Sequence, residues 1–199
     1  MLKTLRESFC AGILIAIGGT VFLSCDNKTV GAVLFSVALL CICYKEYYLF
    51  TGKIGYIVEQ HKKQDFLNLA VGLLGNLIAT FLIGILLREV LPNIGEKAVE
   101  MCSVKLEQKP LYTFIRGLFC GILMYLAVSI YKEKNSVLGV LFCVPVFILC
   151  GFEHSIADMF YFGISGMFKS EIILFIALVV AGNTVGAMIL PLLKGSKKE

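Results

Sequence analysis

Six long apolar stretches run along this chain of 199 residues, and they constrain its fold more than any other feature. They lie at about residues 9–24, 30–56, 66–87, 111–131, 137–162 and 172–193. A helix needs roughly 20 apolar residues to cross the hydrocarbon core of a bilayer. Because lipid offers no hydrogen bonds to the backbone, helices that satisfy their own polar groups are the expected form. The pattern therefore predicts an all-α integral membrane protein with six spans in a single transmembrane domain, residues 1–199.

The composition agrees with this interpretation and argues against a soluble protein. Hydrophobic residues make up 58% of the chain and charged residues 16%, with a mean hydropathy of +0.88, whereas soluble domains are about half apolar and a quarter charged. The net charge of +4 is too small to indicate a nucleic-acid partner. Lys3 and Arg6 precede the first stretch as in a signal peptide, but no clear cleavage site follows and five more stretches do. We therefore expect the first helix to be retained.

The eight cysteines predict neither a metal centre nor a cofactor site. Six of them lie inside apolar stretches, where cysteine packs as a small hydrophobic residue. No Cys-x-x-Cys pair or metal-ligand spacing occurs in the sequence. Cys25 and Cys102 fall near polar connections, so one disulfide is conceivable there.

The lysines and arginines between the stretches predict the orientation of the chain in the membrane. With six spans both termini lie on one side, which carries nine of these charges: Lys3, Arg6, Lys62, Lys63, Lys132, Lys134, Lys194, Lys197 and Lys198. The opposite side carries six: Lys28, Arg88, Lys97, Lys105, Lys109 and Lys169. Because cytoplasmic loops carry the excess of positive charge, we predict a multi-pass protein of the inner (plasma) membrane with both termini in the cytoplasm.

The second and fifth stretches are interrupted by polar residues in their middle, at 45–53 and 151–158. Charged side chains and irregular backbone are tolerated at membrane depth only where they face protein or a water-filled cavity. Two broken helices at corresponding places in two halves indicate a transport site near the midplane. The pattern therefore predicts that spans 2 and 5 are broken helices that line such a site.

Short motifs suggest that the two halves are repeats, at about residues 1–91 and 110–194. The sequence Ala-Gly-Ile-Leu at 11–14 is echoed by Cys-Gly-Ile-Leu at 120–123, and Gly-Asn at 75–76 by Gly-Asn at 182–183. Small residues of this kind commonly serve helix packing alone, and their paired placement supports a repeat in either case. With three spans in each half, the second repeat must be inverted relative to the first.

Residues 151–160, Gly-Phe-Glu-His-Ser-Ile-Ala-Asp-Met-Phe, resemble the fifth-span signature of the formate/nitrite transporter family. Leu-Phe-Thr-Gly at 49–52 resembles the second-span loop of the same family, and Lys109 the lysine before its fourth span. The resemblance implies an aquaporin-like fold of inverted three-helix repeats, assembled as a homopentamer with one pore in each protomer. It also implies a channel or transporter for small monovalent weak-acid anions, such as formate, nitrite or hydrosulfide, together with protons.

The same resemblance implies roles for individual side chains. His154 matches the central pore histidine, Thr51 the threonine that faces it, and Lys109 the lysine of the outer vestibule. The outer constriction is assigned to Phe35, Phe50 and Phe147, and the inner constriction to Leu39, Leu49 and Val128. A bare anion meets a far larger desolvation cost in an apolar constriction than its conjugate acid does. We therefore expect His154 to donate a proton or a hydrogen bond to the substrate, and Lys109 to concentrate anions.

Three residues depart from the family pattern. Asp158 stands where the family usually has asparagine, Arg116 where glutamate is usual, and Tyr125 where many members have asparagine. The larger Tyr125 ring is expected to restrict the pore to the smallest anions, unless it points to a neighbouring helix. Glu153 is expected to fix the broken loop through backbone N–H groups, and Asp158 to suit the N-terminal dipole of the second half-helix.

Other functions remain open at this point. A proton-coupled symporter of short carboxylates such as acetate or lactate fits the sequence as well as a channel does. A membrane-embedded enzyme would have to use His154 with Glu153 or Asp158, but the sequence offers no second intramembrane histidine and no nucleophile–base set. A scaffold protein would not need two broken helices with polar centres. We therefore expect a transport protein and not an enzyme.

Overall fold

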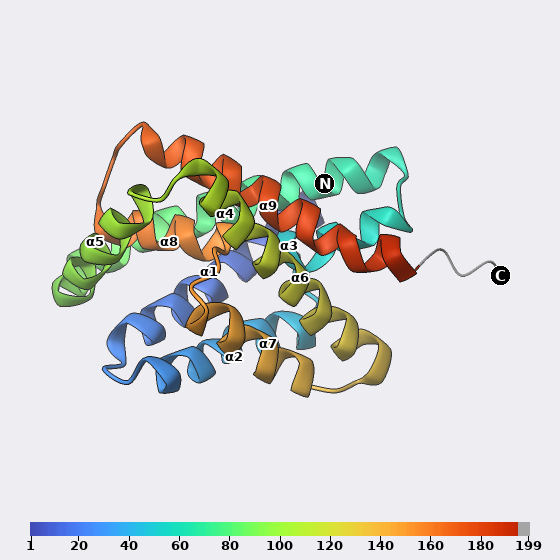
Figure 1. Cartoon of the computed structure of the whole chain (residues 1–199), viewed down its shortest axis with the longest axis horizontal. Coiled ribbons are helices and arrows are strands. Elements are labelled where there is room, and N and C mark those ends of the chain that lie inside the picture. The colour runs from blue at the N-terminus through green and yellow to red at the C-terminus, as the bar shows by residue number, and fades with distance from the viewer. Residues whose placement is uncertain (195–199) are drawn as a thin grey trace.

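The computed structural model describes residues 1–194, and Lys197 and Lys198, counted above among the cytoplasmic charges, lie outside them. Within these residues the chain forms nine α-helices and one 3-10 helix (Figure 1). In chain order they are α1 (Leu2–Ser24), α2 (Lys28–Tyr44), α3 (Phe50–Lys53), the 3-10 helix η1 (Ile54–Val58), α4 (Lys63–Val90), α5 (Pro92–Leu106), α6 (Pro110–Lys134), α7 (Leu138–Leu149), α8 (Ser155–Ser165) and α9 (Glu171–Lys194).

Four of these helices, α1, α4, α6 and α9, are long and apolar enough to cross a membrane. They correspond to the first, third, fourth and sixth predicted spans. The second and fifth stretches each fold as two pieces, a shorter apolar helix (α2 or α7) followed by a non-helical break and a second short helix (α3 or α8). Large side chains such as Leu86, Phe142 and Ile173 are exposed on the outside, as expected of a surface that faces lipid.

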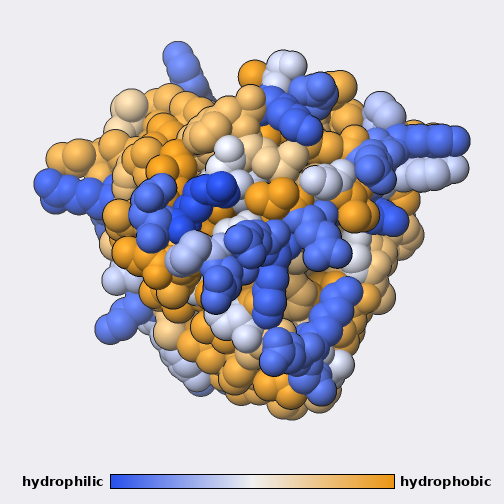
Figure 2. All heavy atoms as spheres, turned by 90° about the vertical axis from the view of Figure 1, so that its left-hand side faces the viewer, coloured by the Kyte–Doolittle hydropathy of each residue, from blue (hydrophilic) through white to orange (hydrophobic). Residues whose placement is uncertain are grey.

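The connections lie in two groups at opposite ends of the molecule. The α1–α2 turn, α5 and the α8–α9 connection lie on the left in Figure 1, whereas η1, the α6–α7 connection and the end of α9 lie on the right. Figure 2 views the left-hand end and shows hydrophilic side chains gathered near its middle within a largely hydrophobic surround. This grouping is the one predicted by the sequence for loops on two sides of a membrane.

The two halves pack in equivalent ways. Helix α1 packs against α2 and α4, α6 packs against α7 and α9, and α2 lies beside α7. The short helices pack against a long helix of the other half: α8 packs against α4, and η1 packs against α9. Gly12 and Gly121, the glycines of the two echoed motifs, let the helices approach closely: a Cβ at Gly12 would meet Ala79, and one at Gly121 would meet the Asn183 backbone.

An asparagine from a long helix holds each helix break. In the first half, Asn76 Nδ2 donates to the carbonyls of Ser8 (2.8 Å) and Tyr48 (2.9 Å), and its Oδ1 accepts from the Phe50 N–H (2.8 Å). These bonds join α1, the break and the start of α3. The asparagine side chain is fully buried, so it satisfies backbone groups that water does not reach.

Asn183 makes the same three kinds of contact in the second half. Its Nδ2 donates to the carbonyls of Gly117 and Glu153, both at 2.9 Å, and its Oδ1 accepts from the Ser155 N–H at 3.0 Å. The Gly-Asn pairs therefore do more than allow close packing, which the sequence alone had left as the simpler interpretation. The second asparagine fixes the backbone on both sides of His154.

All eight cysteines are free thiols. Cys102 is fully buried on α5, whereas Cys25 is partly exposed at the end of α1. The disulfide considered for these two residues is therefore absent from the structure.

The asparagine contacts lead to a stability prediction. Asn183→Ala removes three hydrogen bonds from buried backbone groups, and each unsatisfied group costs about 1–3 kcal/mol. We expect a clearly lower melting temperature for the purified protein in detergent, and a similar loss for Asn76→Ala. Asn93→Ala, at an exposed position of α5, is the matched control and is expected to melt like the wild type. Equal melting temperatures for all three variants would contradict the proposed role of the two asparagines.

Candidate functional site

The two helix breaks bring His154 and Thr51 together. His154 is the residue that precedes α8, Thr51 lies in α3, and the His154 Nε2 and Thr51 Oγ1 atoms are 2.8 Å apart. Both side chains are buried, with exposed fractions of 2% and 1%. The pair predicted from the sequence motifs is thus formed by residues 103 positions apart in the chain.

The hydrogen bonds of His154 define how its ring is protonated. Its Nδ1 accepts from the Ala157 N–H at 3.1 Å, so this nitrogen carries no hydrogen. The hydrogen of the neutral ring therefore lies on Nε2, where it is donated to Thr51 Oγ1. Thr51 keeps its own hydroxyl hydrogen for a further acceptor. The pair consequently presents a hydrogen-bond donor, which suits an anion and not a cation.

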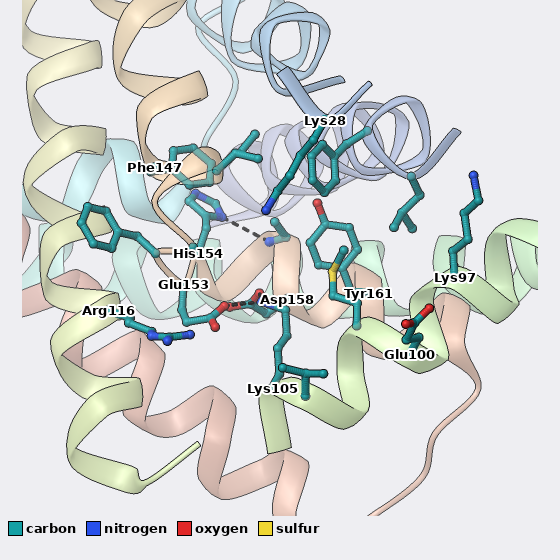
Figure 3. Close-up of a pocket in the computed structure, with 18 of the residues that line it drawn as sticks. Lys28, Lys97, Glu100, Lys105, Arg116, Phe147, Glu153, His154, Asp158 and Tyr161 are labelled. Carbon is teal, nitrogen blue, oxygen red and sulfur yellow. Dashed lines mark hydrogen bonds and ion pairs between the residues drawn. The ribbon is translucent and has the colours of Figure 1, made fainter. Parts of the chain in front are cut away.

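A cavity of about 600 Å³ lies on the α5 side of this pair, and we call it the α5 cavity. His154 and Phe147 line it together with charged residues from several elements (Figure 3), including Lys28, Lys97, Lys105, Arg116, Glu100, Glu153 and Asp158. The Phe147 ring stacks on His154 with 5.6 Å between centroids and meets Phe35 edge to face at 6.2 Å. Two of the three residues assigned to the outer constriction therefore gather beside His154.

A second cavity of about 530 Å³, the α3 cavity, reaches the other break. The three residues assigned to the inner constriction, Leu39, Leu49 and Val128, all line it. Its wall also carries the charged side chains Lys3, Glu7, Lys45, Glu46, Lys53 and Lys132. Two cavities with charged walls thus reach the two helix breaks whose residues form the buried His154–Thr51 pair.

Phe50 and Tyr125 lie apart from the other predicted site residues. Both belong to a separate apolar cluster, and neither is among the residues that line the two cavities. The Tyr125 ring packs against Tyr56 with 5.6 Å between centroids, close to Gly55. The Tyr125 ring therefore lies against neighbouring helices, as in the alternative interpretation, and a role in narrowing the pathway stays a prediction.

Two lysines, Lys105 and Lys109, lie near this end of the molecule, and only Lys105 lines the α5 cavity. Lys109 is exposed at the start of α6, with its ammonium 5.8 Å from the Tyr112 ring centre. Lys105 pairs with Glu153 and, at 3.0 Å, with Asp158 Oδ1. Burial alone favours the neutral amine of Lys105, but the Asp158 and Glu153 carboxylates outweigh this effect and hold its pKa above the ordinary value.

The helical spacing of α5 carried a signal for Lys105. Gly95, Ala98 and Cys102 are the buried residues of this helix, and Lys105 follows three positions later on the same face. A lysine that extends the buried face of an amphipathic helix must reach a partner, because an unpaired buried charge is very costly. The motif match pointed instead to Lys109, four residues further along the chain.

Glu153 binds side chains and not the backbone N–H groups that were predicted. Its Oε1 accepts from Gln108 Nε2 at 2.7 Å, and its Oε2 pairs with Lys105. Its own backbone is held by Asn183 and lies against the Arg116 carbonyl. Glu153 therefore ties α5 to the break that carries His154. Within residues 1–194 no group of His, Cys, Asp and Glu side chains is placed to hold a metal ion.

Comparison with known proteins places the chain in a family. The family model described as "Formate/nitrite transporter" matches residues 1–194. A relative, "Uncharacterized transporter YwcJ" of Bacillus subtilis (strain 168), is 31% identical over 188 residues, covering 82% of this chain and 73% of the relative.

Two solved structures have the same fold. One, titled "FNT family ion channel", superposes with a TM-score of 0.80 at 21% identity and covers 95% of this chain and 85% of the other. The second, titled "Pentameric formate channel with formate bound", has a TM-score of 0.78 at 24% identity and covers 97% and 95%. Because the family model matches nearly the whole chain, this protein belongs to the formate/nitrite transporter family.

Proposed function

We propose that this protein conducts small monovalent weak-acid anions, such as formate, nitrite or hydrosulfide, across the plasma membrane. The observation that carries the proposal is the buried His154–Thr51 hydrogen bond at the two helix breaks that the α5 and α3 cavities reach. Family membership and the shared fold with a structure titled as a pentameric formate channel support it. By the same likeness we propose a homopentamer with one pore in each protomer.

The architecture that we propose has six spans. Helices α2 and α3 form one broken span and α7 and α8 another, which adds two to the four long helices. Residues 1–91 and 110–194 are then inverted repeats of an aquaporin-like fold. The matching contacts of Asn76 and Asn183, each of which holds a break, support this assignment.

The chemistry of permeation follows from the cost of moving a charge through an apolar constriction. A weak acid whose pKa lies three units below the ambient pH is neutralised at a cost of roughly 4 kcal/mol. Leaving water as a bare anion costs far more. In our proposal the anion reaches Thr51 and accepts a hydrogen bond from its hydroxyl, while the His154 Nε2–H donates a hydrogen bond to the Thr51 oxygen. The proton that neutralises the anion comes from water in the cavities, and neither side chain gives up its hydrogen. Phe147, stacked on the histidine ring, excludes water from the His154–Thr51 pair.

We propose that the α3 cavity faces the cytoplasm. Four of its charged wall residues are lysines, Lys3, Lys45, Lys53 and Lys132, against two glutamates, Glu7 and Glu46. An excess of positive charge is typical of the cytoplasmic side. Both chain termini would then be cytoplasmic. Lys109, which is exposed beside α5, would add to the field that attracts anions from the opposite side.

A proton-coupled carrier of short carboxylates is the competing function within the family. Liposome flux across a panel of formate, nitrite, hydrosulfide, acetate and lactate, with internal pH recorded, distinguishes the two. Uptake of small anions supports the proposed channel, and uphill uptake driven by a pH gradient indicates a carrier. No flux of any of these anions would overturn the proposed function.

Replacing the central histidine tests this hydrogen-bonded arrangement directly. We expect His154→Phe to lower formate flux into liposomes by at least about tenfold, because the variant removes the donor that orients the Thr51 hydroxyl, and a hydrogen bond to a charged group is worth about 1.5–3 kcal/mol. His61→Phe, in an exposed connection, is the matched control and is expected to keep wild-type flux. Unchanged flux and unchanged pH dependence in an assembled His154→Phe protein would contradict the proposed role.

The hydroxyl of Thr51 has its own test. Thr51→Val keeps the shape of the side chain but removes the donor that the anion is proposed to meet, so formate flux is expected to fall several-fold. Thr51→Ser restores a hydroxyl and is expected to recover most of the flux. If valine and serine variants transport equally, the hydroxyl plays no part in permeation.

The two lysines of the α5 side are expected to behave differently. Lys109→Glu should lower anion uptake a few-fold at low ionic strength, and more than Lys109→Ala does, with recovery as salt screens the exposed charge. Lys105→Met leaves the buried Glu153 without its cation, so a loss of about 3–5 kcal/mol in stability is expected. A melting temperature for each variant and flux at two salt concentrations check both statements. Salt-independent transport by both Lys109 variants at the wild-type rate would make Lys109 an ordinary surface residue.

A further inference from the structure

Two buried carboxylates share one ammonium group in the wall of the α5 cavity (Figure 3). Lys105 pairs with Glu153 and, 3.0 Å away, with Asp158 Oδ1. The carboxylates are 2% and 1% exposed. If both are ionised, the cluster carries one uncompensated negative charge in a place that water scarcely reaches. A buried charge of this kind is avoided by taking up a proton.

The hydrogen bonds indicate which of the two carboxyl groups holds the proton. Glu153 uses both oxygens, one with Gln108 and one with Lys105, and these contacts favour its ionised form. Asp158 uses only Oδ1, and its fully buried Oδ2 has no hydrogen-bond partner within the described part of the chain. A carboxylate oxygen with no donor is the natural position for a hydrogen.

Lys105 is the cation that forms ion pairs with Glu153 and Asp158. Lys28 and Arg116 also line the α5 cavity, but neither lies within ion-pair distance of these two carboxylates in the described part of the chain. Nearby Cys102 and Tyr161 are neutral at ordinary pH, as is the buried thiol of Cys120 on α6.

The remaining elements that pack against α8 do not alter the charge of the cluster either. Arg88 of α4 binds the Ile164 and Ser165 carbonyls at the far end of the helix. Helix α1 and helix α9 bring no charged group to Asp158 among residues 1–194.

We propose that the cluster of Glu153, Lys105 and Asp158 binds one exchangeable proton, held by Asp158, beside the transport pathway. An asparagine at position 158 could not carry such a proton, so the site depends on the carboxyl group of this residue. With the proton bound the cluster is neutral, and without it the cluster is negative. Both Asp158 and His154 line the same cavity.

The proton would regulate anion entry, and this part of the proposal rests on the proposed function. At acid pH Asp158 is protonated and the Glu153–Lys105–Asp158 cluster is neutral. As pH rises the proton is lost, the cluster becomes negative, and it repels an anion at short range in a poorly screened site. Anion flux is therefore expected to fall on the alkaline side for a reason separate from the protonation of the substrate itself.

Infrared spectroscopy of the purified pentamer in liposomes tests the proton site without any substrate. At neutral pH the wild type is expected to show the carbonyl stretch of one protonated, buried carboxylic acid per protomer, titrating at high pH. Asp158→Asn is expected to lose this band. Glu153→Gln is also expected to lose it, because Lys105 then balances Asp158 alone. Glu100→Gln, an exposed acid of the same cavity, is the control that keeps it.

A wild-type spectrum without the band, or a band that persists in Asp158→Asn, would overturn the proposal. Formate flux in the same liposomes tests the consequence: the ratio of flux at alkaline pH to flux at acid pH should rise several-fold in Asp158→Asn. Equal ratios in variant and wild type would overturn the coupling to anion entry. Absence of flux of every anion in the panel, together with the expected infrared bands, would refute the proposed transport function and leave the proton site standing.

Discussion

Every backbone group at a helix break in the membrane needs a partner, and this requirement shapes the molecule. Asn76 and Asn183 meet it from opposite halves with the same three contacts. In each half one amide joins a long helix, a residue within the break and the first residue of the helix that follows it. Because lipid cannot replace these bonds, the breaks are held at fixed positions. The His154–Thr51 pair has a defined geometry only because both breaks are held in this way.

The site that results combines apolar surroundings with few donors. The Nδ1 of His154 accepts a hydrogen bond from the Ala157 N–H of α8, and its Nε2–H donates to Thr51. The ring is therefore fixed as one neutral tautomer. Phe147 covers the ring on one side. A site of this kind stabilises an acceptor that arrives with its own negative charge more than one that is neutral. A cation would meet a neutral ring and one hydroxyl, with no negative charge on either side chain.

The sequence predicted an all-helical membrane protein of this family because the signals for both are local. Apolar length identified the four long helices, and a ten-residue motif pointed to the family whose model matches residues 1–194. Lys105 was not singled out, because its partner Glu153 lies 48 positions away and the motif match pointed to Lys109 alone. The direction of the Tyr125 side chain could not be predicted, because an aligned position does not define a rotamer; here the ring lies beside Gly55. The contacts of Asn76 and Asn183 could not be predicted from the sequence either, because each asparagine joins three segments that are separate along the chain.

The two cavities differ in how their charges are held, and this difference predicts how each responds to its surroundings. Around the α3 cavity the lysines are solvated, and pairs near that end such as Lys3–Glu7 (3.7 Å) and Lys194–Glu133 (3.8 Å) are largely exposed. Dissolved salt screens such charges. In the α5 cavity Lys105, Glu153 and Asp158 are buried against one another, so salt screens them poorly and protons remain the ions that change their charge. The α3 cavity is therefore expected to respond to ionic strength. The α5 cavity is expected to respond to pH through its buried cluster, while exposed charges on the same side, such as Lys109, stay sensitive to salt.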